Sequence, residues 1–376
     1  MDSHRLVICN YDRLSQPHIR AALRGRRWGT LILDEAHYLK SPNAERTKHV
    51  FGGLAKGVQP LIDFADDRVI ELTGTPMPNH PGELWTHARA LYPESILYRG
   101  KPMELWQFEL RYCQLAQTEH GMKVVGGKNL QELKQALTPF IHRVKYEDVF
   151  GEGSRPAVHT WPLTFNDGQR GPLTVPDLPE LVAKLSQRFG EMPNIEQFDD
   201  KMVDAYLQTI NAYHDALASI RRDTGTLKAV ATALLVREEL EQGCGKTIIF
   251  AWHRDAIETL ARALKAFNPA IVHGAVDAGR RVVEIDRFNN DPTCKVFIGN
   301  ILAAGQAIDL SGGRHIVFAE ASWSPGENNQ AMMRASGVNH CGAGVDVRFV
   351  YLPGSVDEQV TRALARKTAI INQVVG

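Results

Sequence analysis

Residues 31–37 read LILDEAH, an apolar run of strand length that ends in two adjacent carboxylates, Asp34 and Glu35. Similar runs stand at residues 5–11 (RLVICNY) and 68–74 (RVIELTG), with a helical pattern between the first two. Apolar strands separated by helical segments are typical of a parallel sheet with helices on both faces. We therefore expect the first part of the chain to form an α/β structure, with the two acids at the carboxyl end of a strand.

The last third of the chain alternates more regularly between strand and helix patterns. Its expected strands lie at residues 247–252 (TIIFAW), 270–273, 295–299 (KVFIG), 315–319 (HIVFA) and 347–352 (VRFVYL). Residues 226–242 and 255–267 have the apolar spacing of amphipathic helices. This alternation predicts a second doubly wound α/β lobe.

The segment between these parts is less regular. Residues 83–149 favour helices, most clearly at 104–115 and 130–137. Residues 151–179 are rich in Gly and Pro around one extended piece at 158–165, and we interpret them as a connection between the two halves.

Composition limits the class of protein. The chain has 376 residues, enough for two or three domains, and its 43 basic and 43 acidic residues give a net charge of zero. The five cysteines form no CxxC pair, which argues against a disulfide framework and favours a reducing cytoplasm. No apolar run is long enough to span a bilayer and no signal-peptide pattern opens the chain, so we expect no membrane partner.

Further motifs follow the acidic pair in a fixed order. LTGTP at residues 72–76 is followed by Pro81, Glu83 and Leu84; later come residues 303–310 (AAGQAIDL), 323–326 (WSPG) and 330–334 (QAMMR). With LILDEAH, these resemble motifs II, III, V and VI of superfamily-two helicases, and more narrowly the Swi/Snf-like double-stranded-DNA translocases.

Other stretches extend the resemblance over nearly the whole chain. NYDRL at residues 10–14 resembles motif Ib. Residues 110–113 (LRYC), 129–133 (NLQEL) and 141–148 (IHRVKYED) look like the annealing-helicase branch of that family.

The resemblance implies two RecA-like doubly wound parallel-sheet lobes with helical extensions, the first lobe being incomplete. Residues 1–152 would form this partial first lobe with motifs Ib, II and III and a helical extension from about residue 93. Residues 153–225 would be a connection and helical insertion, and residues 226–376 the second lobe with motifs IV, V and VI. ATP would lie between the lobes, and DNA would lie across both.

Asp34 at a strand end can hold the Mg²⁺ of ATP, and Glu35 can orient or deprotonate the attacking water. The simpler interpretation of this pair is a strand followed by a helix whose N-terminus favours acids. The resemblance implies catalytic roles for Asp34, Glu35 and Arg334. It also implies coupling of the nucleotide site to DNA by His37, Thr73 and Thr75, for which a Gly-Thr turn is the simpler interpretation. The cofactor-binding set that it implies comprises Asp34, Gly305, Gln306, Asp309, Gln330 and Arg334.

Two departures from the family pattern bear on catalysis. No phosphate-binding loop of the form GxxxxGK[ST] precedes motif Ib, and Gly337 stands where motif VI has its second arginine. A shorter run, GCGKT at residues 243–247, has Leu240 at the position of the first glycine and precedes a strand. We interpret it as the stop of a helix, because a phosphate loop needs a helix N-terminus behind it.

Three hypotheses follow for function. The first is a Swi/Snf-like DNA-dependent ATPase in an N-terminally truncated or degenerate form. The second is a non-catalytic DNA-binding or assembly module that retains the helicase fold. The third is a separate P-loop enzyme built on GCGKT. The family cofactors are ATP and Mg²⁺, and no other metal-ligand spacing is present.

Local charge suggests where DNA would bind. Residues 1–60 hold ten basic and five acidic residues, a local net charge of +5, and Arg20, Arg24 and Arg27 fall on one helical face. Such a face can follow DNA phosphates, although a solvated helix surface is the simpler interpretation. The other predicted contacts are Arg143, Lys145, Lys228 and Arg281. No base-reading motif is present, so we expect backbone contacts to double-stranded or branched DNA. We expect a cytoplasmic location, associated with the nucleoid if the host is a prokaryote or a virus; the sequence does not identify protein partners.

Overall fold

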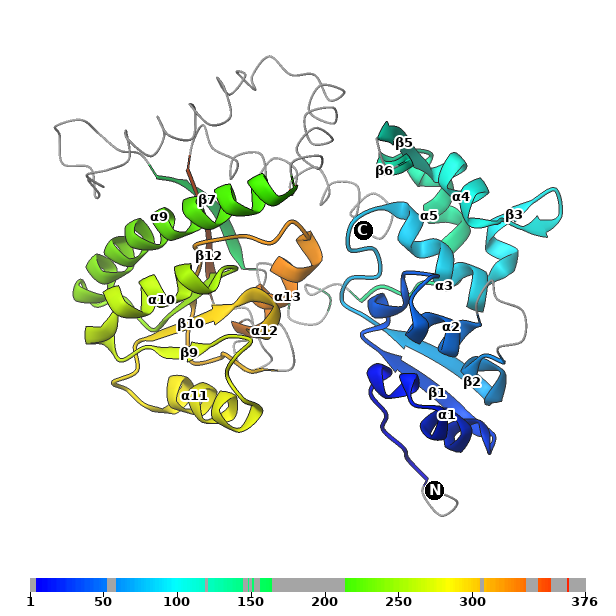
Figure 1. Cartoon of the computed structure of the whole chain (residues 1–376), viewed down its shortest axis with the longest axis horizontal. Coiled ribbons are helices and arrows are strands. Elements are labelled where there is room, and N and C mark those ends of the chain that lie inside the picture. Colours follow the sequence, from blue (N-terminus) through cyan, green and yellow to red (C-terminus); the bar gives the residue numbers. More distant parts are fainter. Residues whose placement is uncertain are drawn as a thin grey trace. The chain divides into compact units, whose positions relative to one another are not determined.

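The computed structural model describes residues 5–52, 59–118, 121–144, 148, 151, 156–163, 214–304, 308–335, 344–352 and 364. The chain divides into two compact units, which we describe separately (Figure 1). The first unit comprises Met1–Arg143 with Lys367–Gly376, and the second comprises Val144–Arg366.

The second unit is built on a six-stranded parallel sheet. Its strands lie in the order β7 (Ala157–Pro162), β12 (Asp346–Tyr351), β11 (His315–Phe318), β8 (Thr247–Ala251), β10 (Val296–Asn300) and β9 (Ala270–Val272). The five strands predicted in the last third of the sequence are all present, which confirms the α/β doubly wound fold.

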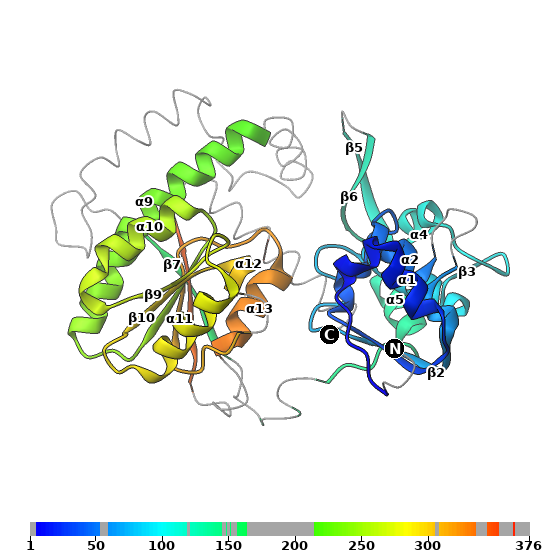
Figure 2. The ribbon, with the colours of Figure 1, turned by 60° about the horizontal axis from the view of Figure 1, so that its bottom comes forward.

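Helices cover both faces of this sheet (Figures 1 and 2). On one face, α9 (His214–Glu241) and α10 (Arg254–Ala263) bury Ile249 and Ala251 of β8. On the other, α11 (Ala278–Asn290), α12 (Ile301–Ala304) and α13 (Pro325–Ala335) bury Ile248 and Phe250. Successive side chains of a strand point to opposite faces, so a strand buried on both faces has an unbroken apolar sequence. The short helix η7 (Lys265–Phe267) continues from α10.

Strand β7 is a correction to the sequence analysis. The extended piece at residues 158–165 was interpreted as part of a connection, but β7 is an edge strand that pairs with β12 from Ala157↔Asp346 to Pro162↔Tyr351. Its partner is almost 190 residues away in the sequence, as the register shows, so no local pattern could reveal the pairing.

The core of the first unit is smaller. Two parallel strands, β1 (Trp28–Asp34) and β2 (Ala65–Leu72), pack with α1 (Pro17–Arg24) and α2 (Glu45–Phe51). Three short helices complete this layer: η1 (Tyr11–Ser15), η2 (Ala36–Leu39) and η3 (Leu61–Phe64).

The strand predicted at residues 5–11 is wrong. The chain has no regular structure there until η1 begins at Tyr11, where Asn10 Oδ1 accepts a hydrogen bond from Asp12 N at 3.0 Å. The side chains of Leu6 and Ile8 are exposed. An asparagine cap satisfies backbone donors locally and so competes with strand pairing.

The rest of the first unit is a helical extension of α3 (Leu84–Leu91), α4 (Leu105–Tyr112) and α5 (Leu130–Leu137), which share one core. The short helices η4 (Pro81–Glu83) and η5 (Pro93–Ile96) and the two-residue strands β3 (Leu97–Tyr98) and β4 (Lys101–Pro102) connect them. This confirms the helices expected at 104–115 and 130–137, except that the first ends at Tyr112. From there, β5 (Cys113–Thr118) and β6 (Gly121–Gly127) form an antiparallel ribbon (Figure 2), so the prediction of helix was wrong for this segment.

Among the described residues, no helix is long and apolar enough to cross a bilayer. Nor does any group of three or more His, Cys, Asp or Glu side chains within those ranges have an arrangement that could hold a metal ion.

Candidate functional site

The acidic pair lies where β1 ends. The parallel register pairs Asp34 with Leu72, so the residues that follow β1 and β2 start from the same edge of the sheet. The Asp34 side chain is exposed, and Glu35 adopts the left-handed conformation (φ 47°) that turns the chain into η2. Such a backbone is uncommon for a residue with a Cβ and is often found at functional sites.

His37 connects the two loops that leave this edge. Its Nδ1 lies 3.2 Å from Glu35 Oε2 and 3.2 Å from Thr73 Oγ1. Thr73 Oγ1 in turn accepts a hydrogen bond from the backbone N–H of Thr75 at 3.1 Å. The structure thus brings together the four residues Glu35, His37, Thr73 and Thr75. These contacts connect the loop after β1 with the loop after β2.

Tyr11 is a residue of this site that sequence reasoning missed as a functional candidate. Its hydroxyl donates a hydrogen bond to the backbone carbonyl of Asp34 at 2.8 Å. Burial, followed by the charges of Glu71, Asp34 and Glu35, raises the pKa of Tyr11 far above its usual value, so it remains a neutral donor. The available signal was its place in the NYDRL motif.

Glu83 forms a second link between the loops. Its carboxylate, 8% exposed, accepts hydrogen bonds from Lys40 Nζ at 2.7 Å and from the backbone N–H and the side chain of Asn79 at 2.7 and 2.8 Å. Burial opposes ionisation most strongly, but the charge of Lys40 and the bond from Asn79 outweigh it and lower the pKa of Glu83. Thr86 Oγ1 also donates to the carbonyl of Lys40 at 2.8 Å, so α3 holds the turn after η2.

In the second unit, the predicted motif V and motif VI residues meet through the backbone. The N–H of Leu310 donates to the carbonyl of Arg334, near the end of α13, at 3.1 Å. The carboxylate of Asp309 accepts hydrogen bonds from Ser311 N at 2.9 Å and Ser311 Oγ at 3.1 Å, so it shapes its own turn. Gln330 lies half-buried on α13. Gly305 and Gln306 lie outside the described residues, as does Gly337.

A buried carboxylate that sequence reasoning missed closes the carboxyl edge of this sheet. Glu320, directly after β11, accepts hydrogen bonds from the backbone N–H groups of Trp252 and His253 at 2.8 Å each. Its other oxygen lies 2.7 Å from His253 Nδ1. Burial opposes ionisation most strongly, but the bonds from His253 and the charge of Lys228 lower the pKa of Glu320. An acid inside an apolar strand–loop segment gave no sequence signal of this role.

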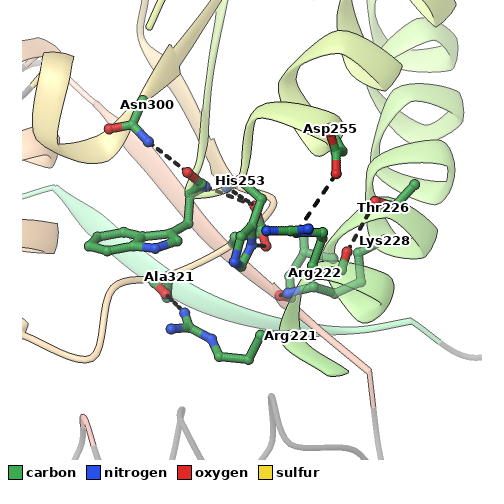
Figure 3. Close-up of polar contacts among 11 residues, drawn as sticks. Arg221, Arg222, Thr226, Lys228, His253, Asp255, Asn300 and Ala321 are labelled. Atoms are coloured by element: carbon green, nitrogen blue, oxygen red, sulfur yellow. Dashed lines mark hydrogen bonds and ion pairs between the residues drawn. The ribbon is translucent and has the colours of Figure 1, made fainter. Parts of the chain in front are cut away.

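Lys228 therefore has a structural role in place of the predicted DNA contact. It is 2% exposed, and its Nζ donates to the carbonyl of Val350 at 3.2 Å. Figure 3 shows this region of α9, where Arg221 donates to the carbonyl of Ala321 at 2.9 Å and Arg222 lies 3.8 Å from Asp255. The amino-terminal part of the described α9 is thereby fixed to the carboxyl edge of the sheet.

Of the three arginines predicted on one helical face, Arg20 and Arg24 lie on α1, but Arg27 lies beyond its end, because α1 stops at Arg24 and Gly25 caps it. Arg27 Nε donates to Asp66 Oδ1 at 2.7 Å, and Arg27 Nη1 donates to the carbonyl of Asp63 at 2.6 Å. Arg20 donates to the carbonyls of Leu14 and Ser15. Arg24 is half-buried.

Of the other predicted DNA contacts, Arg281 of α11 donates to the carbonyl of Val276 at 2.8 Å and so supports the loop before its own helix. Arg143 is exposed at the end of the first unit. Lys145 lies outside the described residues.

The GCGKT run is not a phosphate loop. Helix α9 ends at Glu241, Gly243 has a φ of +91°, and β8 begins at Thr247. Lys246 donates to the carbonyls of Phe288 and of Asp291, the latter at 2.8 Å, at the carboxyl end of α11. Lys246 therefore satisfies the last carbonyls of α11, while the glycines before it end α9, which agrees with the interpretation as a helix stop.

Two family models match the sequence. The model described as SNF2-related domain matches residues 1–172, and the one described as helicase conserved C-terminal domain matches residues 228–337.

Curated relatives match along the whole chain. The human DNA annealing helicase and endonuclease ZRANB3 is 28% identical over 386 residues, which covers 100% of this chain and 32% of the relative. A Caenorhabditis elegans homolog of SWI/SNF-related matrix-associated actin-dependent regulator of chromatin subfamily A-like protein 1 is 25% identical over 382 residues, covering 99% of this chain and 49% of the relative. The chain spans about a third of the length of the ZRANB3 relatives.

Among solved structures, the Sulfolobus solfataricus SWI2/SNF2 ATPase core in complex with dsDNA is 21% identical and has a TM-score of 0.40. The match covers 97% of this chain and 72% of that chain. The two family matches follow one another in the order of the motifs, and the named relatives match across both. By both family matches, and by its relatives along the whole length, the chain is similar to the Swi/Snf-like helicases of superfamily two.

Proposed function

We propose that the chain is the core of an ATP-dependent motor that moves along double-stranded DNA and remodels or reanneals it. The observation that carries this proposal is the set of contacts from Glu35 through His37 to Thr73 at the carboxyl edge of β1 and β2. In a motor, the residues that handle the nucleotide must be connected to those that respond to DNA, and this geometry supplies a connection within the first unit. The names of the relatives support DNA as the partner and annealing as the activity.

The residues at the end of β1 fit the chemistry of a nucleotide-bound Mg²⁺. Asp34 offers an exposed carboxylate, the ligand type that Mg²⁺ prefers, while Tyr11 fixes the backbone carbonyl of the same residue. When bound, ATP with Mg²⁺ supplies a phosphoryl group for transfer to water. Asp34 would hold the metal, and Glu35, oriented by His37, would orient the water and accept its proton.

The second unit would supply positive charge and support. Arg334 would neutralise charge that develops on the γ-phosphoryl group. Gly305, Gln306 and Gln330 complete the proposed cofactor-binding set. Asp309 would act through its turn, since its carboxylate is bonded to Ser311.

DNA-stimulated ATP hydrolysis by the purified full chain tests the proposal. We expect Asp34→Asn and Glu35→Gln each to lower turnover by on the order of 10²-fold or more, because each removes a group that acts on the reacting atoms. Asp66→Asn is the matched control: it removes an exposed carboxylate at the opposite end of the β1–β2 pair, and turnover should be unchanged. Comparison of linear with branched duplexes then shows which DNA stimulates turnover more.

A second candidate is a non-catalytic DNA-binding or assembly module. It is favoured by the position of Lys246, because the lysine of the sole GKT run in the sequence is bonded to the end of α11. This candidate predicts no turnover with any DNA, together with duplex binding that weakens steeply with salt. Turnover that depends on Asp34 and Glu35 would exclude it.

A further inference from the structure

Helices α1 and α2 of the first unit bring several cationic side chains together. Arg20 and Arg24 come from α1, and Lys48 and His49 come from α2; the two helices share the core that includes Leu23. We refer to these four residues as the α1–α2 basic cluster. The carboxylate of Glu45 lies beside it, with Lys48 Nζ at 2.8 Å and His49 Nε2 at 3.8 Å.

Two polar atoms of the cluster are buried without a hydrogen-bond partner among the described residues. They are Nη2 of Arg24 and Nδ1 of His49. Buried polar atoms in native proteins are nearly always bonded, and those that are not bonded to protein commonly meet water or an ion. Two unbonded atoms in one basic cluster therefore point to a ligand that can accept hydrogen bonds.

Electrostatics favour an anion as that ligand. Burial, followed by the charges of Arg20 and Arg24, lowers the pKa of His49, and Lys48 adds to this while Glu45 opposes it. Burial and the charge of Arg20 lower the pKa of Arg24 as well. Three permanent cations thus face one carboxylate, which is already bonded to Lys48. An anion among them would relieve their mutual repulsion.

Arg27, which lies beyond the end of α1, shows that not every basic residue of this region belongs to the cluster. It follows Arg24 by three residues, yet it is bonded to Asp66 and to the carbonyl of Asp63. Its charge is compensated within the protein, and both members of the pair are exposed. Arg27 is therefore a control for a basic residue of the same region outside the cluster.

We propose that Arg20, Arg24 and His49 form a binding site for a phosphate group, with Lys48 contributing charge at its border. The guanidinium of Arg24 and the protonated imidazole of His49 would donate to phosphate oxygens, and charge-assisted bonds of this kind are the strong ones. The phosphate group could belong to the DNA backbone or be free inorganic phosphate. This proposal identifies which of the predicted arginines bind phosphate. Where the phosphate group belongs to DNA, the proposal rests on the proposed function.

Because His49 must gain a proton to donate from both ring nitrogens, phosphate binding and protonation strengthen each other. The charged groups that face His49 are Arg20 and Arg24 from α1 and Glu45 and Lys48 from α2. Because burial and the neighbouring cations lower the pKa of His49, this histidine gains its proton below the ordinary histidine pKa of about 6.5. The affinity for the phosphodiester groups of DNA, whose charge is constant in this range, should therefore rise as the pH falls below about 6.5.

Titration of the His49 imidazole by NMR in the full chain tests the site, with the resonance assigned by its loss in His49→Gln. Inorganic phosphate is compared with chloride at equal ionic strength, and a short duplex DNA forms a second arm. We expect phosphate to raise the pKa of His49 and Arg24→Leu to weaken this binding about tenfold or more, since it removes a charge-assisted bond. Arg27→Leu should leave the binding unchanged.

The stability of Arg24→Leu separates a binding site from a structural role. Without phosphate this variant should melt at or above the temperature of the wild type, because it removes an unbonded buried donor, and phosphate should no longer raise its melting temperature. If Arg24→Leu does not fold, the phosphate dependence of melting in His49→Gln gives the same comparison.

The site is assigned to DNA if the duplex shifts the pKa of His49 at a concentration of phosphate groups far below the concentration of inorganic phosphate that gives the same shift. Equal effects per phosphate group assign it to free phosphate. A His49 resonance that responds to neither ligand overturns the proposal, as does an equal loss of binding in Arg24→Leu and Arg27→Leu. If the chain binds phosphate but shows no ATP hydrolysis, the missing hydrolysis contradicts the proposed function, whereas the phosphate site stands.

Discussion

The two parallel sheets of this chain begin from similar apolar strands but are stabilised differently. In the second unit, β8 is buried along its whole length, between α9 and α10 on one face and α11 to α13 on the other. In the first unit, one face of β1–β2 packs into the core and the other is open: Ile32 is 58% exposed and Leu72 is 49% exposed. Apolar burial is the main stabilising contribution to a fold, so the second sheet should be the more stable of the two.

Polar links hold the loops that leave the carboxyl edge of the first sheet. The bonds from Tyr11 to Asp34, from Thr75 to Thr73 and from Lys40 to Glu83 all hold the loops at one end of a two-stranded pair. Segments with few buried apolar contacts open locally at low cost in free energy. The candidate site at the end of β1 therefore lies in the part of the molecule that we expect to open locally at the lower cost in free energy.

The largest expected effect is in the second sheet. Phe250→Ala in β8 removes a fully buried ring that packs against Phe318, at a ring-centroid distance of 5.1 Å. We expect the free energy of unfolding of the second unit to fall by about 3–5 kcal/mol. Denaturant unfolding followed by the fluorescence of Trp252 and Trp323 in single-tryptophan variants measures it. A loss below about 1 kcal/mol would mean that the second core is not well packed and would remove the contrast between the sheets.

Glu83→Ala should give the next largest effect, now in the first unit. It leaves Lys40 and the backbone N–H of Asn79 without their buried acceptor, which we expect to cost about 2–3 kcal/mol. Hydrogen exchange of the amides in β1 and β2 measures the loss. Glu94→Ala, at an acid in η5 outside these contacts, is the control and should leave exchange unchanged.

The lowered pKa of Glu83 predicts a pH dependence. The stabilisation is fully present above the pKa of an unfolded glutamate, about 4.3, and is lost as the pH falls through the lower native pKa. The protection of β1 and β2 in wild type should therefore decrease more steeply below pH 4 than in Glu83→Gln, which cannot titrate there. Parallel acid profiles of the two proteins would contradict this assignment.

Gly225→Ala tests the polar centre of the second unit with a smaller expected effect. A Cβ at this position of α9 would lie 2.0 Å from Oε1 of Glu320, although alanine favours a helix. We expect a net loss of about 1–2 kcal/mol, since the carboxylate must move away from its donors. The double variant Gly225→Ala with Glu320→Ala should show less than the sum of the single losses. Strict additivity would mean that the two residues do not interact.

The smallest effect is expected at the open face of the first sheet. Ile32→Thr exchanges an exposed apolar side chain for a β-branched polar one, so the free energy of unfolding should change by less than about 0.5 kcal/mol. The same exchange at Ile249, fully buried in β8, is the matched control and should be strongly destabilising. A large loss at Ile32 would show that this face is covered in solution and would change the comparison of the two sheets.

Much of the fold could be predicted because its signal is local. The strands β8, β10 and β11 are largely apolar runs, β12 is apolar apart from Asp346 and Arg348, and α5 matches the expected bounds of 130–137. The pairing of β7 with β12 and the ribbon of β5 with β6 were not predicted, because they depend on hydrogen bonds to distant residues. The polar role of Glu320 was missed for the same reason: its donors lie 67 and 68 residues away.

The sequence by itself determined the family, the α/β class and the acidic pair with its LTGTP partner, since motif order and strand periodicity are properties of consecutive residues. Only the tertiary structure decided which charged side chains have their hydrogen-bonding groups satisfied within the protein and which do not. Lys228 and Arg27 look like DNA contacts in a sequence, but one is buried against Val350 and the other is bonded to Asp66. Arg24 and His49 meet from two separate helices as buried atoms without a bond. Burial and pairing depend on residues that are distant in the chain, so charge alone cannot specify a binding surface.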